Sequence, residues 1–214
     1  MPSCCVQQSD YRRFFKTSIA RRDARRYRKR GLDKVSRRLR DAVVARGVAG
    51  ARVLEGGGGI GAIQLELFEA GAAGATNVEL SAAYEGEAAA LLRERSLEAR
   101  VERRIGDFAA LDLPSADVVL LNRVVCCYPD HRALVGAAAA RTGRILALTF
   151  PRERALTRLG FRAINLALAV RRCGFRTFIH PVAEILDAAR DQGLRPVTLE
   201  PSGAIWHVAV LERA

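Results

Sequence analysis

Residues 51–61 read Ala-Arg-Val-Leu-Glu-Gly-Gly-Gly-Gly-Ile-Gly, an apolar segment that runs into an acid and a glycine loop. Glycine lets a backbone turn sharply and lie close to a ligand, because a Cβ would clash or forbid a positive φ. After the loop, Ile60, Ile63 and Leu67 have helical spacing, and Gly71 is a helix stop signal. A strand, a glycine turn and a helix N-terminus in this order indicate a cradle for a nucleotide-type cofactor.

The glycines fit two different cofactor-binding patterns. One is G-x-G-x-x-G, the dinucleotide fingerprint, which is formed by Gly56, Gly58 and Gly61. The other is E-x-G-x-G-x-G, which is formed by Glu55, Gly57, Gly59 and Gly61. The second pattern resembles motif I of the class I S-adenosylmethionine (SAM)-dependent methyltransferases, with Glu55 standing where Asp is common in that family.

Polar residues after the next three expected strands favour the methyltransferase pattern. Glu79 and Leu80 end the second strand, where the family places the carboxylate that holds the ribose hydroxyls. Residues 105–108 end the third strand, where the family's Asp meets the adenine amino group. The segment 117–122 resembles the fourth strand, and its polar turn would face the substrate.

The resemblance extends from about Val53 to Arg213 and implies a set of cofactor contacts. The glycine loop would pass the methionine portion of SAM with Glu55 near its ammonium, Glu79 would bridge the ribose hydroxyls, and Asp107 would meet the adenine. The implied cofactor-binding residues are Glu55, Gly56, Gly57, Gly59, Gly61, Glu79, Leu80, Gly106, Asp107, Phe108, Asn122 and Arg123.

The rest of the chain alternates between strand and helix patterns, which is typical of a parallel sheet covered on both faces. We expect helices over 131–141, 154–172 and 182–192, and strands over 144–150, 196–199 and 206–211. The helix over 154–172 looks inserted relative to the minimal fold. The predicted architecture is α/β: a Rossmann-like, doubly wound, mostly parallel seven-stranded sheet with an antiparallel C-terminal strand and a helical N-terminal lid.

Charge divides the chain into two parts. Residues 11–46 hold 15 Lys or Arg and three Asp, whereas the other residues hold 20 basic and 20 acidic side chains. Apolar residues four apart in this segment predict two amphipathic helices: Tyr11, Phe15 and Ile19 in the first, and Val35, Leu39 and Val43 in the second. Gly31 would end the first helix and Asp33 would cap the second. We therefore expect residues 1–46 to be a basic helical extension or lid, and residues 47–214 to be one SAM-binding methyltransferase domain. A solvated basic face that packs on the body, or a nucleic-acid contact surface, is the alternative.

Composition limits the cellular setting. No apolar run is long enough to span a membrane, and the N-terminus lacks an apolar signal core, so we expect a cytoplasmic protein. The adjacent pairs Cys4-Cys5 and Cys126-Cys127 have no C-x-x-C spacing, so we expect no metal site.

Candidate catalytic groups lie where open α/β sheets bind ligands, beyond the carboxyl ends of the strands. A hydroxyl acceptor needs a base, whereas a carboxylate or thiolate acceptor needs none. The turn after the fourth strand offers Tyr128 and His131, and an arginine-rich crossover offers His180. A structural role for each histidine is the alternative.

The functional hypothesis is therefore methyl transfer from SAM to a small, anionic acceptor, with O-methylation favoured. Pro151-Arg152 and the arginine-rich helix that follows are similar to magnesium-protoporphyrin carboxyl O-methyltransferases, and arginine clusters suit a carboxylate. An RNA or DNA methyltransferase is one alternative, although Asn122 is not followed by the Pro-Pro-aromatic turn that holds a flipped base. An NAD-binding oxidoreductase is another, but it does not account for Glu55 or Asp107.

Overall fold

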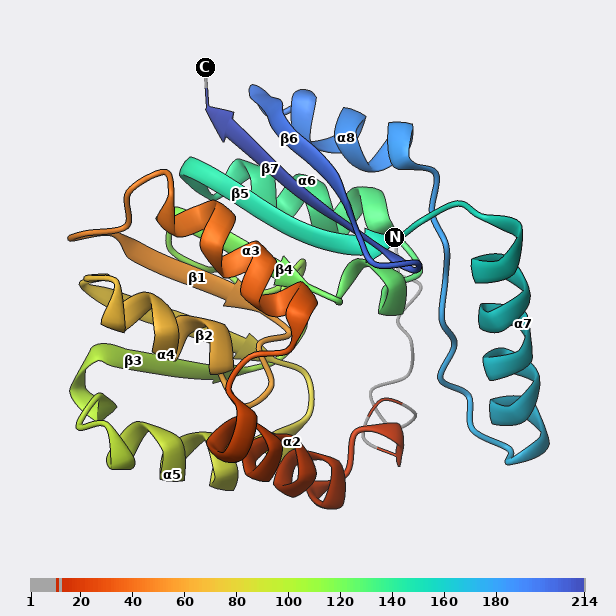
Figure 1. The fold of residues 1–214 in the computed structure, drawn as a ribbon, viewed down its shortest axis with the longest axis horizontal. Helices are drawn as coiled ribbons and strands as arrows, with labels where there is room; N and C mark the ends of the chain where they lie inside the picture. Colours follow the sequence, from red (N-terminus) through yellow and green to blue (C-terminus); the bar gives the residue numbers. More distant parts are fainter. Residues whose placement is uncertain (1–10, 12, 214) are drawn as a thin grey trace.

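The structure is a computed structural model of the 214-residue chain that describes residues 11 and 13–213. Within these residues, seven strands form one sheet in the order β3-β2-β1-β4-β5-β7-β6 (Figure 1). Only β7 runs against its neighbours, since it pairs antiparallel with both β5 and β6. The strands are β1 Arg52–Gly56, β2 Gly74–Glu79, β3 Val101–Ile105, β4 Ala116–Asn122, β5 Thr142–Pro151, β6 Leu194–Ser202 and β7 Trp206–Arg213. The predicted sheet is confirmed.

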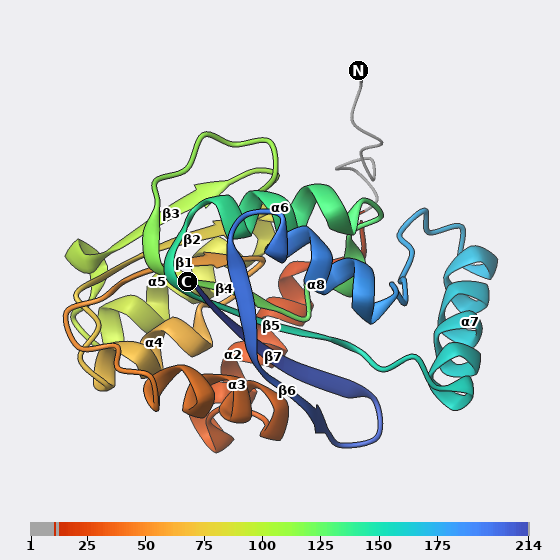
Figure 2. The same ribbon diagram turned by 90° about the horizontal axis from the view of Figure 1, so that it is seen from above.

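Helices cover both faces of the sheet (Figure 2). On one face lie α3 and α4, and on the other lie α6 and α8; α2 and α5 pack beside each other at the edge that β3 forms (Figure 1). The α-helices are α2 Thr17–Arg30, α3 Lys34–Val44, α4 Ala62–Glu69, α5 Glu85–Glu94, α6 His131–Ala140, α7 Ala155–Val170 and α8 Val182–Arg190. Three short 3₁₀ turns are η1 Ala82–Tyr84, η2 Glu98–Arg100 and η3 Val125–Cys127.

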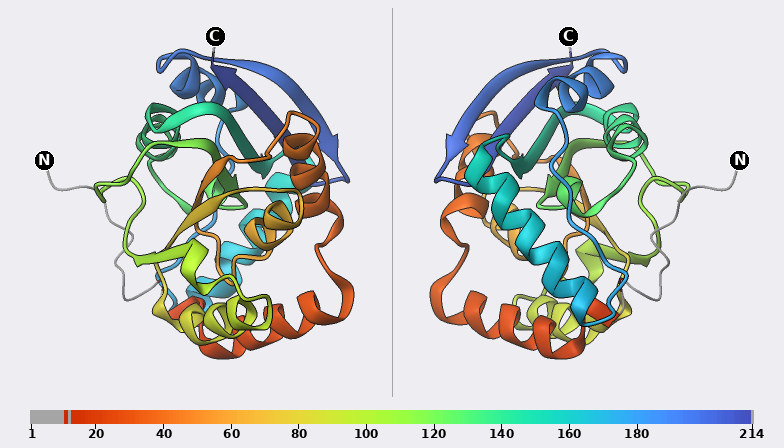
Figure 3. Two further views of the ribbon diagram at one scale, coloured as in Figure 1. Left: turned by 90° about the vertical axis from the view of Figure 1, so that its left-hand side faces the viewer. Right: turned by 90° about the vertical axis from the view of Figure 1, so that its right-hand side faces the viewer.

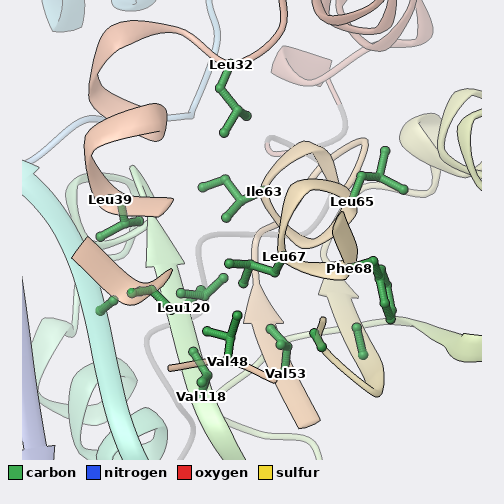
Figure 4. Close-up of a cluster of buried hydrophobic side chains, with 14 of the residues drawn as sticks. Leu32, Leu39, Val48, Val53, Ile63, Leu65, Leu67, Phe68, Val118 and Leu120 are labelled. Carbon is green, nitrogen blue, oxygen red and sulfur yellow. The ribbon is translucent and has the colours of Figure 1, made fainter. Parts of the chain in front are cut away.

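The core follows the alternation of side chains along the central strands. Val118 and Leu120 of β4 pack with α3 and α4, as Figure 4 shows, whereas Val119 and Leu121 pack with α6 and α8. All four side chains are fully buried. A strand that is apolar on both faces needs two helical layers, which explains the doubly wound arrangement.

The N-terminal basic segment forms two helices that pack on the body. Asp33 caps α3, since its carboxylate accepts hydrogen bonds from the N–H groups of Val35 and Ser36. The stripe predicted from Tyr11 onward is broken, however, because Lys16 is extended (φ −94°, ψ 162°) and α2 begins only at Thr17. Ala20, Ala24 and Tyr27 of α2 belong to the main core. Helix α2 is thus part of the folded body.

Helix α7 leaves the end of β5 and stands at the outer edge of the molecule (Figures 1 and 3). Asn165 holds it to the returning chain: its Nδ2 donates to the carbonyl of Thr177 (2.8 Å), and its Oδ1 accepts from the N–H of Thr177 (2.8 Å). The helix is shorter than the predicted 154–172. Strand β5 includes Pro151, which was expected to lie beyond it; Pro151 pairs with Trp206 at the strand end.

Among the helices of the described residues, none is long and apolar enough to cross a membrane.

Candidate cofactor site

A cavity of about 490 Å³ lies beyond the carboxyl ends of β1, β2 and β4. The strand order reverses between β1 and β4, and such a switch point is where open α/β sheets bind ligands. The body contributes Gly57, Gly58, Gly59, Ile60, Glu79, Tyr84, Asn122, Arg123 and Val124 to its lining. The N-terminal segment contributes Tyr11, Phe14, Phe15, Ile19, Arg22, Asp23 and Arg26. Five predicted cofactor residues (Gly57, Gly59, Glu79, Asn122 and Arg123) therefore meet at one cavity.

The glycine loop requires the absence of side chains. Gly57 and Gly59 have φ values of +61° and +55°, in the left-handed region that L-residues rarely adopt. A Cβ on Gly57 would lie 2.6 Å from a methyl carbon of Val124, and one on Gly59 would lie 3.3 Å from the Tyr84 ring. Gly56 has no room for a Cβ beside Leu121 and Phe108, and Gly61, at φ +77°, is the N-cap of α4.

Glu79 joins the end of β2 to the glycine loop. Its carboxylate accepts hydrogen bonds from the N–H of Gly59 (2.9 Å) and from the N–H of Ser81 (3.0 Å). Burial raises the pKa of Glu79 above its usual value, although these N–H groups and that of half-buried Leu80 oppose the shift. A buried carboxylate that lines a cavity can accept hydrogen bonds from ligand hydroxyls.

Glu55 lies beneath the loop and is not part of the cavity lining. A Cβ on Gly58 would lie 2.7 Å from the Glu55 carboxyl carbon, and Asn77 Nδ2 donates to the carboxyl group at 3.4 Å. Burial raises the pKa of Glu55 to about 8, which the charge of Arg103 only partly offsets. Glu55 is therefore mostly protonated at neutral pH in the unliganded protein.

Asp107 is not among the residues that line this cavity, and its carboxylate accepts hydrogen bonds from another predicted residue. The Tyr128 hydroxyl donates to both carboxylate oxygens of Asp107, at 3.0 and 2.9 Å. The N–H of Ala109 donates to the same carboxylate. Gly106 donates its N–H to the carbonyl of Glu79, which places the ends of β2 and β3 side by side. Phe108 is buried against Gly56.

Asn122 and Arg123 tie the end of β4 to helix α3. Asn122 Nδ2 donates to the Ser36 hydroxyl (3.0 Å), and an Arg123 guanidinium nitrogen lies 2.6 Å from an Asp33 carboxylate oxygen. Arg123 also has a positive φ of +59°, and its guanidinium lies 5.2 Å from the centre of the Trp206 ring. The turn is held in this conformation by the N-terminal extension and β7 together.

Asp33→Asn should lower the free energy of unfolding at neutral pH by about 1 kcal/mol, because Asn still caps the helix but cannot pair with Arg123. Burial alone would raise the pKa of Asp33, but Arg123 and the capping N–H groups lower it below its usual 3.8. The stabilisation is therefore present above that value and is lost as the pH falls through the folded-state pKa. Urea unfolding of the protein and of Asp33→Asn, at neutral pH and at a pH below the folded-state pKa of Asp33, measures this difference. Equal stability at neutral pH would contradict a stabilising pair.

The three predicted catalytic residues form a cluster of their own. The rings of His131 and His180 stack at 4.2 Å, and His180 Nε2 lies 2.9 Å from the carbonyl oxygen of Tyr128. Burial lowers the pKa of His180 below its usual value, and the nearby His131 adds to this. None of the three residues is among those that line the cavity in the described part of the chain. Their role as bases stays a prediction.

The described cysteines, Cys126, Cys127 and Cys173, are not among the residues that line the cavity. The Cys126 and Cys127 sulfurs lie 3.6 Å apart, and both thiols are free. The other two adjacent cysteines, Cys4 and Cys5, lie outside the described residues.

Sequence reasoning missed residues that shape the cavity from other elements. Tyr84 packs beside Gly59, and Arg103 of β3 donates to the carbonyl of Gly59 at 3.0 Å. The one signal that could have indicated Tyr84 is its position five residues after the predicted ribose acid Glu79, on η1. Arg103 could not have been distinguished from the many other arginines of the chain.

Neither a family model nor a curated protein matches this sequence. Solved structures do match. Magnesium protoporphyrin IX methyltransferase (ChlM) from Synechocystis PCC 6803 with bound S-adenosylhomocysteine (SAH) is 21% identical, with a TM-score of 0.75 over 97% of this chain and 99% of that chain. Its SAM-bound structure is 20% identical, with a TM-score of 0.73 over all of both chains.

Two further matches show how far the fold extends. An O-methyltransferase family protein from Burkholderia thailandensis is 20% identical, with a TM-score of 0.65 over 84% of this chain and 56% of that chain. The [4+2]-cyclase SpnF is 17% identical, with a TM-score of 0.63 over 82% of this chain and 80% of that chain. The chain has the fold of the class I SAM-dependent methyltransferases, as the sequence predicted. Because a cyclase shares this fold, the reaction has to be argued from the site.

Proposed function

We propose that this protein transfers a methyl group from SAM to a small, anionic acceptor, most favourably to an oxygen atom. One observation carries the proposal: a single cavity brings together the side-chain-free loop Gly57–Gly59 and the buried carboxylate of Glu79. A ligand that fits it must lie against bare backbone and offer hydroxyl groups to an acid. The volume of about 490 Å³ is in the range of small-molecule sites.

The residues present fit SAM. Glu79 would accept hydrogen bonds from the ribose hydroxyls, and Gly57 and Gly59 would let the methionine portion approach the backbone. Glu55 would lie beneath that portion. Leu80, Gly106, Asp107 and Phe108 lie outside the observed cavity lining but at the adjoining ends of β2 and β3, and we propose that they provide the adenine side. The bound cofactor would supply an activated methyl group on a positively charged sulfur.

The protein's own contribution would be binding, orientation and exclusion of water. Phe14, Phe15 and Ile19 of the N-terminal segment line the same cavity as the glycine loop, so they would shield the reacting atoms from solvent. Arg22 and Arg26 line the cavity and would attract an anionic acceptor. A carboxylate acceptor is already ionised at neutral pH and needs no base, which supports an anionic acceptor.

Isothermal titration calorimetry with SAH and with NAD tests the cofactor assignment. We expect SAH to bind and NAD not to bind, because Glu79 and the glycine loop match the ribose and amino-acid portions of SAM. Micromolar binding of NAD with no heat from SAH would overturn the proposal in favour of an oxidoreductase.

Arg22→Glu/Arg26→Glu should lower kcat/KM for carboxylate acceptors at least about tenfold, the scale of one charge-assisted hydrogen bond, and more than it lowers kcat/KM for neutral acceptors. Both arginines line the cavity. The measurement is transfer of labelled methyl from SAM to small carboxylates and their neutral amides. Arg25→Glu/Lys29→Glu is the matched control, since these residues of the same helix line a separate surface hollow. Equal losses in both variants would show that only overall charge matters.

A nucleic-acid methyltransferase is the second candidate function, because basic side chains gather on the surface of α2. Arg21, Arg25, Arg28 and Lys29 line a hollow of about 430 Å³ together with Glu87. Arg28 is engaged, however, by ion pairs with Glu87 and Glu94 of α5. Nanomolar RNA binding at physiological salt that is lost in Arg25→Glu/Lys29→Glu would favour this candidate, since loose phosphate contacts weaken steeply with salt.

A further inference from the structure

Helix α7 carries a concentration of exposed large hydrophobic side chains. Five of the nine large hydrophobic side chains that are exposed among the described residues lie on this helix. Leu156, Leu159, Leu166 and Val170 are 84%, 63%, 67% and 77% exposed. Such a concentration on one element marks an interaction surface.

These side chains form one continuous face. Leu156, Leu159, Ala163, Leu166 and Val170 follow each other at intervals of three and four residues, so they line a single stripe along the helix. The buried residues Thr157 and Leu168 lie on the other side, where Asn165 holds the returning chain. The helix therefore turns its polar anchor inward and its leucine stripe outward, at the outer edge of the molecule (Figure 3).

The charged residues around the stripe are almost all positive. Positions 152–176 contain seven arginines and a single acid, Glu153, which pairs with Arg158 at 3.2 Å. Arg162 and Arg171 follow the helix on opposite flanks of the stripe, as the rotation of 100° per residue requires. Within the described part of the chain, no ion pair engages Arg162, Arg171 or Arg172.

We propose that α7 docks on the surface of an anionic lipid bilayer. The leucine stripe would enter the boundary between headgroups and acyl chains, and the flanking arginines would contact the lipid phosphates. A second copy of this chain fits less well, because two such helices would bring clusters of arginine together without acidic partners. The proposal does not depend on methyl transfer.

Vesicle co-sedimentation of the full chain tests this directly. We expect binding to phosphatidylcholine vesicles that contain roughly one-quarter phosphatidylglycerol, and much weaker binding to pure phosphatidylcholine. Leu159→Asp/Leu166→Asp should weaken partition into the anionic vesicles at least about tenfold, because it removes apolar area and places charge at the interface. Both side chains are exposed, so circular dichroism and the melting temperature should stay unchanged.

Val197→Asp/Leu199→Asp is the matched control. These β6 side chains are 40% and 41% exposed, and their replacement changes the net charge by the same amount. The control should keep most of the vesicle binding, which separates α7 from the general attraction of the basic N-terminal segment. Equal loss in both double variants would overturn the proposal. So would a dimer that only Leu159→Asp/Leu166→Asp dissociates, together with no vesicle binding, since α7 would then be a subunit interface.

Discussion

Gly57→Val should abolish SAH binding, with an affinity loss of at least about 100-fold, while the protein stays folded. The valine Cβ would fall 2.6 Å from a Val124 methyl carbon at a φ of +61°. The loop would have to move, or the side chain would fill the cavity that the loop lines. Calorimetry with SAH and far-UV circular dichroism measure the two effects.

Gly50→Val separates backbone strain from the cavity. Gly50 has a φ of +72° and open space around the position of a Cβ, and it lies just before β1, at the opposite end of the strand from the loop. Gly50→Val should lose stability through backbone strain, of order 1–3 kcal/mol as expected for the strain in Gly57→Val, but should keep its SAH affinity. If Gly57→Val also keeps its affinity, the glycine loop is not the cofactor cradle.

Glu79→Ala should weaken SAH binding by about 2–4 kcal/mol, roughly 30- to 1000-fold, since the variant loses charge-assisted hydrogen bonds to the ligand. It also leaves the N–H of Gly59 without its acceptor, so the loop loses its tie to β2. Titration calorimetry gives the affinity, and thermal unfolding gives the structural part of the effect.

Glu79→Gln distinguishes the two contributions. Gln keeps one oxygen that can accept from Gly59, but its NH2 group would face the N–H of Ser81 and it carries no charge. We therefore expect a loss of affinity and a loss of stability that are both smaller than in Glu79→Ala. Unchanged affinity in both variants would show that another group holds the ribose.

The sheet could be predicted because its signals are local. The apolar strand before Gly56 and the acid at Glu79 fix the positions of β1 and β2, and both were found where expected. The break at Lys16 could not be predicted from spacing. Phe15 of the predicted stripe instead joins an aromatic cluster with its neighbour Phe14 and with Phe175, which is distant in the sequence.

The site was predictable only where a motif marks it. Gly57, Gly59 and Glu79 belong to ordered motifs, whereas the pairing of Arg123 with Asp33 joins elements that no local pattern connects. The candidate bases show the same limit. Tyr128 follows β4 in sequence, as a site residue should, yet its hydroxyl is engaged by Asp107. Side-chain direction after a turn depends on tertiary packing.

The protonated carboxyl group beneath the glycine loop has a consequence for the whole molecule. The pKa of Glu55 is about 8 in the folded protein and 4.5 in a solvated chain, so folding takes up a proton between these values. The free energy of unfolding therefore declines as the pH rises through that window, whereas the pairing of Asp33 is lost only on the acid side. From these two groups, we expect the highest melting temperature in mildly acidic solution, and a positively charged ligand near Glu55 would extend that stability towards alkaline pH.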